Sequence, residues 1–254
     1  MAWMSLAMAR LSVNVNKVAT LRNSRGGHEP SVPQAVQVVL DAGARGITVH
    51  PRADERHITG RDVRELGALL APLRDTVEYN IEGDPRPDLL AMVHEVRPHQ
   101  CTLVPVRPGE ITSQAGWPAA TPRAELAAVI ADLSAAGVRV SLFVDPDHDA
   151  VAMARDVGAH RVELYTEPFA RAFERGPAAA AESFALYAGA ARAAHAGGLG
   201  VNAGHDLDLA NLVLFRTLPH LEEVSIGHAL MSRALFVGLR TAVLDYLAAV
   251  ETTP

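Results

Sequence analysis

RAELAAVIADLSAAGVRVSLFVD, residues 123–145, joins a helical pattern to a strand pattern across one glycine. Its first part is rich in alanine and leucine, which favour a helix. Gly137 can end that helix in the left-handed conformation that suits glycine, and RVSLFVD at 139–145 has the β-branched and aromatic residues of a strand. Such a pair is one unit of an α/β protein, so the number of these units in the chain decides its fold.

The same unit recurs along all 254 residues. Short apolar runs alternate with longer helical stretches, among them 33–43, 123–137, 177–197 and 229–250. Four helical stretches end at a glycine, where we expect the left-handed C-cap: Gly43, Gly137, Gly158 and Gly197. The predicted strands are LSVNV (11–15), GITVH (46–50), VEYNIE (77–82), QCTLVP (100–105), RVSLFVD (139–145), RVELYT (161–166), GVNAGH (200–205) and EVSIGH (223–228).

Eight strand and helix units predict an α/β fold of the (β/α)8 TIM barrel type. A doubly wound open sheet is less favoured, because no GxGxxG turn follows the first predicted strand. No linker rich in proline, serine or charge divides the chain, so we expect a single barrel domain over residues 1–254.

Composition limits the classes of partner. Hydrophobic residues make up 49% of the chain, and the net charge of −6 argues against a nucleic-acid surface. A single cysteine, Cys101, allows no intrachain disulfide and predicts a core residue in a reducing cytoplasm. Apolar stretches fall short of the roughly 18–20 residues that span a bilayer, and MAWMSLAMAR at 1–10 does not read as a signal peptide. We therefore expect a cytoplasmic protein with neither membrane nor nucleic acid as a partner.

Polar side chains stand at the carboxyl ends of nearly all the predicted strands, where barrels place their active sites. We expect the middle of the barrel to be filled by Val, Leu and Ile. One such polar group alone is more often a satisfied or surface residue, but several converging on one rim indicate acid/base chemistry. The residues are Asn14, Asn16, His50, Glu82, Asp145, Glu163, Thr166, Asn202, His205 and His228.

Among these, His50, Glu82 and His205 form the natural proton-transfer set. Histidine changes charge near neutral pH, and burial raises the pKa of a carboxyl group toward that range. His50, His205 and His228 could instead bind a metal, but neither HExxH nor close His/Asp spacing supports that, so we predict no metal site.

Phosphate groups have two candidate positions. SIGHAL at 225–230 runs from a strand into a helix, so the N–H groups of Gly227 and His228 can face an anion. After the first strand, ATLRNSRGGHEP carries Arg22 and Arg25 in what we expect to be a mobile cationic loop for a second oxyanion. The alternatives for both arginines are solvated surface charge and a salt bridge between subunits.

Three further segments bear on the site. In TVHPRADERHITGRDV, Arg52 and His57 precede a predicted capping box of Thr59 and Asp62 and could close on a phosphorylated substrate. Residues 105–122 form a long loop that we interpret as a lid over the barrel mouth, with disorder as the alternative. Residues 167–177 predict a short extra helix.

These segments, taken together and in order, resemble the pyridoxine 5′-phosphate synthase family of vitamin B6 biosynthesis. The resemblance runs from SVNVNKVATLRNSRG through GITVHPRADERHIT, NIEG, VELYT and VNAGH to SIGHALMSRALFVGL. It implies a TIM barrel with extra helices, assembled as a homo-octamer and acting as a transferase. The enzyme would condense 1-deoxy-D-xylulose 5-phosphate with 3-amino-2-oxopropyl phosphate, releasing inorganic phosphate and water, with neither cofactor nor metal.

The resemblance also implies roles for individual residues. His50 would be an acid/base residue, Glu82 a proton acceptor, His205 a proton donor and Glu163 a transition-state stabiliser. The aminoketone phosphate would contact Asn14, Arg25, Asp206, Gly227 and His228, and the deoxyxylulose phosphate would contact Asn16, Lys17, Arg52, His57 and Thr112.

Four positions depart from the family's usual pattern. Asn16 and Lys17 stand where Asp and His are common, and Glu167 and Asp206 each stand where Gly is common. A carboxylate at 206 would repel a phosphate dianion unless its side chain turns away. Two rival functions remain: a phosphate-dependent isomerase or aldolase acting through Lys17, and a non-catalytic protein that binds a phosphorylated ligand.

Overall fold

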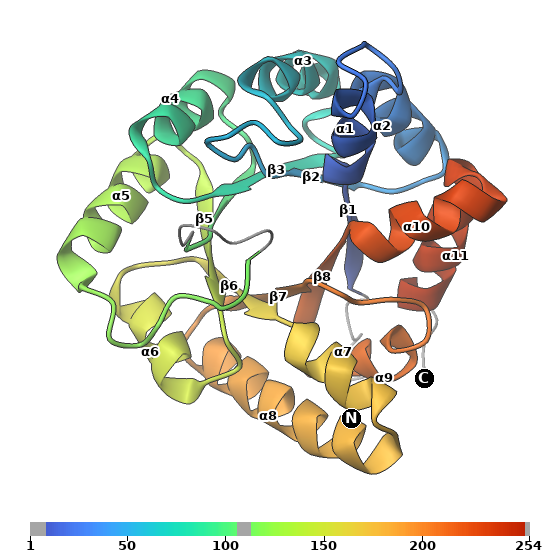
Figure 1. The fold of residues 1–254 in the computed structure, drawn as a ribbon. Coiled ribbons are helices and arrows are strands. Elements are labelled where there is room, and N and C mark those ends of the chain that lie inside the picture. The colour runs from blue at the N-terminus through green and yellow to red at the C-terminus, as the bar shows by residue number, and fades with distance from the viewer. Residues whose placement is uncertain (1–8, 106–112, 252–254) are drawn as a thin grey trace.

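The computed structural model describes residues 9–105 and 113–251, and within them eight parallel strands close into a barrel. Each strand pairs with the next along the chain, and β8 pairs with β1. The helices form a ring around this barrel (Figure 1). The predicted TIM barrel is confirmed. The strands are β1 Arg10–Asn14, β2 Gly46–Val49, β3 Glu78–Gly83, β4 Gln100–Leu103, β5 Arg139–Val144, β6 Arg161–Tyr165, β7 Gly200–Gly204 and β8 Leu221–Ile226.

The helices lie where the sequence predicts them, with one break. The short helix expected after β6 is present as α7, but the helix expected over 229–250 is two helices separated by Gly238. Gly238 has φ 83° and ψ 149°, which turn the chain and end α10. The α-helices of the described ranges are α1 Asn16–Asn23, α2 Val32–Asp41, α3 Gly60–Leu70, α4 Pro87–Val96, α5 Arg123–Ala135, α6 His148–Asp156, α7 Glu167–Glu174, α8 Pro177–Ala196, α9 Leu212–Phe215, α10 His228–Val237 and α11 Leu239–Glu251.

Helices end at glycine in all four predicted cases, and three of these glycines have the expected left-handed conformation. Gly43, Gly137 and Gly158 have φ values between 80° and 107°. Gly197 follows the last residue of α8 as predicted, but the left-handed conformation expected there is wrong: its φ is −79°, and its N–H still donates to the Ala193 carbonyl as a helical residue would. The left-handed conformation falls one residue later, on Gly198.

Polar side chains fill the barrel, which corrects the expectation of a Val, Leu and Ile interior. Ser12 and Thr48 hydroxyls lie 2.7 Å apart, Asn80 Nδ2 donates to Thr48, and Thr102 donates to Asn80 Oδ1 at 3.1 Å. Because side chains alternate along a strand, the apolar residues between them, such as Val13, face the helices instead. The apolar core is therefore the shell between strands and helices.

Ion pairs lie at the amino ends of the strands. Glu78 of β3 is buried and pairs with Arg10 of β1 at 3.0 Å and with Arg139 of β5. Arg161 donates to Asn202 Oδ1 at 2.8 Å, and Asn202 donates to Glu223 Oε1 at 3.3 Å. Charges of both signs thus occupy the end of the barrel opposite the strand carboxyl termini.

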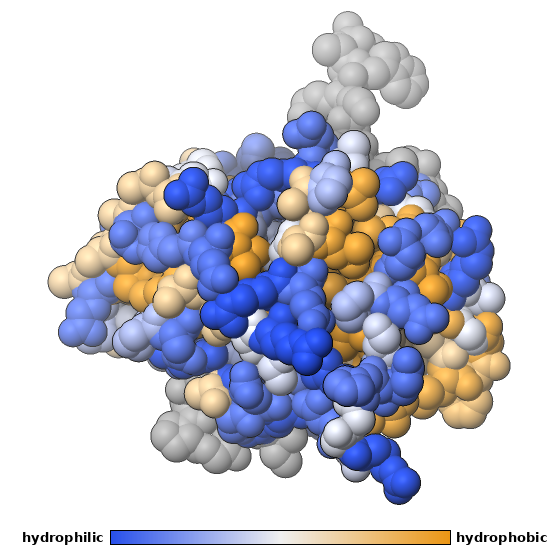
Figure 2. Space-filling view, turned by 90° about the horizontal axis from the view of Figure 1, so that it is seen from above, coloured by the Kyte–Doolittle hydropathy of each residue, from blue (hydrophilic) through white to orange (hydrophobic). Residues whose placement is uncertain are grey.

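The outer helices present a charged surface to solvent. Figure 2 views the flank that lies uppermost in Figure 1, and hydrophilic residues spread across it with hydrophobic ones between them. On α3, Arg61 pairs with Glu65 and Arg64 pairs with Glu95 of α4. In the part of the chain that the structure describes, no helix is both long and apolar enough to cross a membrane.

Candidate active site

A cavity of about 500 Å³ opens at the carboxyl ends of the strands. Its walls come from segments far apart in the sequence, which only the closed barrel brings together. The predicted residues that line it are Asn14, Asn16, Lys17, His50, Arg52, His57, Glu82, Glu163, His205, Asp206, Gly227 and His228.

Two of the predicted substrate contacts do not line the cavity, and neither do Asp145, Thr166 and Asn202, which were also predicted at this rim. Arg25 is exposed beyond the end of α1, and Thr112 lies outside the described residues. Arg22, also proposed for an oxyanion, makes a two-pronged ion pair with Asp62 at 2.5 and 2.9 Å. The predicted mobile cationic loop is therefore partly wrong: residues up to 23 form α1, and Arg22 holds α1 against the start of α3.

His50 and Glu82 face each other at the ends of β2 and β3, with His50 Nδ1 3.7 Å from Glu82 Oε2. Burial lowers the pKa of His50 to about 3, and repulsion from Arg52, from Arg86 and from His57 in its protonated form acts in the same direction. Burial also raises the pKa of Glu82 well above its ordinary value, and the neighbouring carboxyl groups of Glu163 and Glu223 add to the rise. Burial therefore favours a neutral imidazole and a protonated carboxyl group in this pair.

Glu163 of β6 is a second buried acid in the same cavity. Burial raises its pKa to about 7, against the lowering effects of a hydrogen bond with Thr102 and of His205. A Cβ on Gly204 of β7 would lie 2.4 Å from Glu163 Oε1, so a side chain at 204 would displace this carboxyl group. A carboxyl group with this pKa can exchange protons near neutral pH.

His205 lies at the end of β7 and carries an unusual backbone. Its Nδ1 is 2.8 Å from Asp206 Oδ2, and its ring packs edge-on against Tyr165 with centroids 5.2 Å apart. His205 and Asp206 have φ values of 89° and 61°, a region that non-glycine residues rarely adopt. Asp206 thus lines the cavity with its carboxylate engaged by the neighbouring imidazole.

Groups suited to anions lie on two sides of the cavity. The N-terminus of α10 begins at His228, directly after Gly227, and Lys17 lines the same cavity. Arg52 and His57 come from the loop between β2 and α3, whose predicted capping box is confirmed: Thr59 and Asp62 exchange hydrogen bonds. The N-terminus of α10 and the side chains of Lys17 and Arg52 therefore give this cavity groups that suit phosphate anions.

Asn14, the last residue of β1, and Asn16 also make hydrogen bonds to backbone N–H groups. Asn14 Oδ1 accepts from the Asn16 N–H, and Asn16 Oδ1 accepts from the His50 N–H, both at 3.0 Å. The second bond ties the start of α1 to the end of β2. Asn16 therefore helps to set the position of His50.

The structure adds residues that the sequence prediction missed. Ser225 was detectable in principle, because it alternates with the outward-facing Val224 and Ile226. Val104 and Phe143 form an apolar wall with Tyr165, a contact that no local pattern indicates. The additional lining residues are Thr20, Arg56, Val104, Ser113, Phe143 and Ser225.

The predicted lid at 105–122 is only partly described, since residues 106–112 lie outside the described ranges. Its later part packs on the barrel: Trp117 N–H donates to the Phe143 carbonyl, and Trp117 Nε1 donates to the Leu103 carbonyl. Gly116 approaches so closely that a Cβ would meet Val144 Cα at 2.3 Å. This stretch is anchored over β4 and β5, and its Ser113 lines the cavity.

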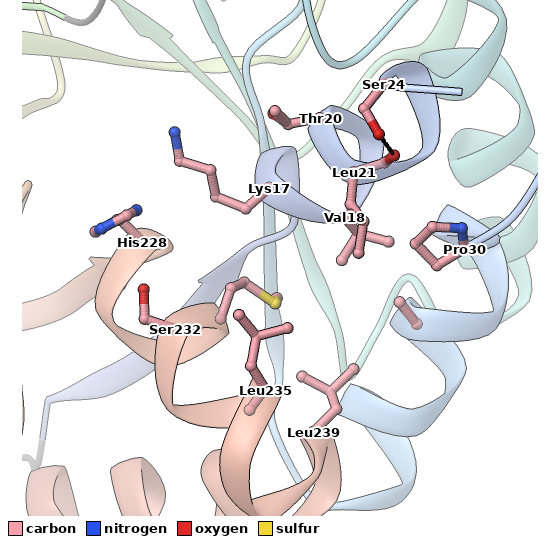
Figure 3. A pocket seen from close by; sticks show the side chains of 13 residues that line it. Lys17, Val18, Thr20, Leu21, Ser24, Pro30, His228, Ser232, Leu235 and Leu239 are labelled. Carbon is pink, nitrogen blue, oxygen red and sulfur yellow. Dashed lines mark hydrogen bonds between the residues drawn. The ribbon is translucent and has the colours of Figure 1, made fainter. Parts of the chain in front are cut away.

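A second cavity of about 490 Å³ adjoins the first between α1, α2 and α10. Lys17 and His228 belong to both cavities. In Figure 3 these two side chains lie on one side, while aliphatic side chains such as Val18, Leu21 and Leu235 occupy the space between the helices. This second cavity is an apolar groove beside the polar site.

Among the residues that the structure describes, no group of three or more His, Cys, Asp or Glu side chains is arranged to hold a metal ion. Cys101 is buried in the core, and burial raises its thiol pKa to about 12. Its placement agrees with the prediction of a core residue.

Comparison with known proteins gives the family. The family model described as "Pyridoxal phosphate biosynthesis protein PdxJ" matches residues 11–252. The chain belongs to the PdxJ family. A protein of Bacteroides fragilis named "Pyridoxine 5'-phosphate synthase" is 51% identical over 243 residues, covering 94% of this chain and 98% of that protein. A protein of Leptospira biflexa with the same name is 49% identical over 250 residues, covering 94% and 96%.

Solved structures of other proteins share the barrel. Tryptophan synthase of Mycobacterium tuberculosis superposes with a TM-score of 0.63 at 13% identity, covering 97% of this chain and 94% of that chain. A 4-hydroxy-2-oxoglutarate aldolase from TTHB1 gives 0.61 at 18% identity, covering 97% and 96%. Identities this low show the fold alone, whereas the relatives of the PdxJ family share half of their residues with this chain.

Proposed function

We propose that this protein is a pyridoxine 5′-phosphate synthase that condenses 1-deoxy-D-xylulose 5-phosphate with 3-amino-2-oxopropyl phosphate and releases inorganic phosphate and water. The observation that carries the proposal is the convergence of His50, Glu82, Glu163 and His205 on one cavity, in a chain of the PdxJ family. Imine formation, loss of water and phosphate, and ring closure require repeated proton transfers, which these side chains can supply.

The protonation states support a division of roles. His50 is uncharged at this pKa, so its Nε2 can accept a hydrogen bond from the attacking amine. Burial raises the pKa of Glu82 and favours its protonated form, whereas a cationic amine or imine beside it would lower this pKa and make Glu82 an acceptor. Glu163, with a pKa of about 7, would stabilise positive charge when ionised, and His205 would donate a proton to a departing oxygen.

Two phosphate positions fit the cavity. We assign one phosphate to the N-terminus of α10, at Gly227 and His228 with Asn14 nearby, where N–H groups and the helix dipole favour an anion. The other phosphate would meet Lys17, Arg52 and His57. Anchoring both substrates by their phosphates would orient the amine toward the ketone. Arg25 and Thr112 remain proposed contacts by resemblance.

Turnover with both substrates tests the proposal. Purified protein should release phosphate and form pyridoxine 5′-phosphate only when both substrates are present. Glu82→Gln should lower turnover by about 100-fold or more, the usual scale for losing a general base, whereas Glu125→Gln on the exposed face of α5 should not. Phosphate release from a single substrate would favour the isomerase or aldolase alternative through Lys17, and tight binding without turnover would favour a binding protein.

A second copy of this chain is the partner that we propose for the apolar groove, in keeping with the homo-octamer that the family resemblance implies. Leu21, Leu235 and Phe236 are 54%, 76% and 89% exposed beside or within the groove. Phe236 lies next to the apolar groove on the same surface, which suits a two-fold contact. In such a contact, Phe236 of each copy would insert into the groove of the other copy. A cytoplasmic location also stays a prediction, supported by one buried cysteine.

Light scattering on the full chain tests this contact. The wild type should be an oligomer, and Phe236→Asp should yield a smaller species. Val213→Asp, at a side chain that is 64% exposed on α9, is the matched control and should leave the mass unchanged. A monomeric wild type would contradict the proposed contact.

A further inference from the structure

We propose that Asp206 is a positioning residue, which fixes the ring orientation and tautomer of His205 so that Nε2 faces the substrates. The inference rests on the proposed function, in which His205 is a proton donor. It departs from the role that the family resemblance assigns to position 206, which is contact with a phosphorylated substrate.

The carboxylate of Asp206 is hydrogen-bonded to the imidazole of His205. Asp206 Oδ2 lies 2.8 Å from His205 Nδ1, within hydrogen-bond range. That hydrogen bond is the main reason that the pKa of Asp206 lies below its ordinary value, and charges at His205, His228 and Arg171 lower it further. Asp206 is therefore ionised at neutral pH, and an ionised carboxylate can only accept from Nδ1.

The backbone around the pair is unusual, and other residues hold it in place. Both His205 and Asp206 have positive φ values, a conformation that costs roughly 1–3 kcal/mol in a residue with a side chain. Thr166 donates to the Gly204 and His205 carbonyls, and Asn211 Nδ2 donates to the Asp206 carbonyl at 3.0 Å. Glycine would adopt the backbone conformation at 206 without this strain. An aspartate at this position is therefore explained by the hydrogen bond between its carboxylate and His205.

Two contacts constrain the orientation of the His205 ring. The Tyr165 ring packs against the His205 imidazole edge to face, and Asp206 Oδ2 is hydrogen-bonded to Nδ1. Titratable side chains that line the same cavity include Glu163, His50, His228, Glu82, His57 and Lys17. With Nδ1–H given to Asp206, Nε2 is the ring nitrogen that can serve a substrate.

The proton balance follows from this arrangement. Protonated His205 carries a proton on each nitrogen, and it would give the Nε2 proton to the oxygen of a departing hydroxyl or phosphate as the C–O bond breaks. The neutral ring that remains keeps its proton on Nδ1, which Asp206 already stabilises. The carboxylate itself gains no proton in this step, because its role is to hold the tautomer.

Position 206 also bears on phosphate binding. The carboxylate would repel a dianion placed directly against it. We therefore assign the nearby phosphate to the Gly227 and His228 end of the cavity, with Asp206 turned toward His205.

Three substitutions of Asp206 test the inference. Asp206→Gly removes the acceptor and suits the positive φ, so the variant should fold; Asp206→Asn removes the charge at constant size; Asp206→Glu keeps a carboxylate. Imidazole ¹⁵N NMR of the full chain, with the His205 signals identified by their loss in His205→Gln, reports which nitrogen carries the proton. The matched control is Glu167→Gln, which removes a carboxylate that pairs with Arg171 on α7.

We expect neutral His205 to carry its proton on Nδ1 in the wild type and to lose this preference in Asp206→Gly and Asp206→Asn. With both substrates, kcat should fall about tenfold in these variants while KM stays within about twofold, less than for a fully buried triad because Asp206 is partly exposed. Asp206→Glu should restore part of kcat, and Glu167→Gln should match the wild type.

Two results would overturn the inference: an unchanged His205 tautomer in Asp206→Gly, or a rise in KM at constant kcat, which would make Asp206 a substrate contact. An absence of wild-type turnover would instead reject the proposed function. The NMR result decides the placement of Asp206 in either case, since it needs no turnover.

Discussion

Burial sets the resting charge of the His50 and Glu82 pair. Two groups 3.7 Å apart could form an ion pair in water, but both lie under the barrel mouth with little solvent contact. Desolvation disfavours each charged form, so the histidine loses its proton and the acid keeps one. His50 Nε2 is buried and makes no hydrogen bond within the described residues, which leaves it ready to accept one from a substrate.

The first prediction is that His50 and His57 stay neutral at pH 6. Burial lowers their pKa values to about 3 and about 4, so neither ring should take up a proton until the pH falls well below 6. Imidazole NMR across pH 4–8 measures this, with His50→Gln and His57→Gln identifying the two sets of signals. A midpoint between pH 6 and 7 for His50 would contradict the neutral pair.

At the scale of elements, the ion pair between Arg22 and Asp62 links α1 to α3. Asp62 accepts two hydrogen bonds from Arg22 while closing the capping box with Thr59. Burial acts to raise the pKa of Asp62, but the bonds from Arg22 and Thr59 outweigh it and the pKa is lowered. This contact places α1, and with it Asn16 and Lys17, at the cavity.

The second prediction is that Asp62→Asn lowers the free energy of unfolding by about 1–3 kcal/mol at pH 7. Because the folded-state pKa of Asp62 lies below the unfolded value, its contribution is fully present above the unfolded pKa and is lost as the pH falls through the folded one. The difference between wild type and variant should therefore shrink in acid. Urea unfolding at pH 3 and pH 7 measures it, with exposed Asp75→Asn as the control that should change little.

The third prediction concerns the break between α10 and α11. Gly238 has φ 83°, and a Cβ built there meets nothing within 4 Å. Gly238→Ala should therefore cost about 1–2 kcal/mol of stability from backbone conformation alone. Gly27→Ala also has open space but no positive φ, so it should change stability by less than about 0.5 kcal/mol. Equal thermal stability of the two variants would reject the backbone explanation.

Local patterns predicted the elements well because each unit carries its own signals. Gly137 and Gly158 end helices through their own conformations, and Thr59 with Asp62 caps α3 within four residues. The break at Gly238 was missed, because alanine- and leucine-rich sequence on both sides favours a continuous helix. The pairing of Arg22 with Asp62 spans 40 residues, and no local pattern reveals it.

The candidate site was predictable for a similar reason. Closing a parallel barrel brings all strand carboxyl ends to one rim, so Asn14, Glu82 and His205 had to meet once the strands were placed. The partners inside the site were not predictable. Whether Asp206 faces a phosphate or His205 depends on two backbone angles at residues 205 and 206, and a sequence does not state them.

At the scale of the whole molecule, the barrel interior is a column of polar and ionisable groups. Strands in such barrels usually point Val, Ile and Leu inward, yet here the alternating residues of β3 that face inward are Glu78, Asn80 and Glu82. Two buried acids at its amino end respond to pH in opposite ways. Arg139 and Arg10 lower the pKa of Glu78 against the effect of burial, whereas burial and Glu78 raise the pKa of Glu223 to about 8.

The fourth prediction follows from these opposite shifts: the stability of the whole barrel should pass through a maximum in pH. Glu78 contributes stability above its unfolded pKa, which is lost as acid protonates it in the folded state. Glu223 binds a proton more tightly when folded, so its effect is favourable in acid and is lost as the pH rises toward about 8. Glu223→Gln should therefore gain about 1–3 kcal/mol over wild type at pH 9 and gain little at pH 5.

Removing the Glu78 carboxylate should have the opposite effect on the pH dependence of stability. Glu78→Gln leaves Arg139 and Arg10 without their buried carboxylate, so it should lose stability at neutral pH, by about 2–4 kcal/mol, and approach wild type in acid. Guanidinium unfolding from pH 4 to pH 9 measures both curves, with Glu125→Gln on α5 as the exposed control. The stability curve of Glu223→Gln could instead run parallel to that of the wild type from pH 4 to pH 9. Glu223 would then have to be ionised in the folded barrel, and the proposed protonated acid beneath the active site would be wrong.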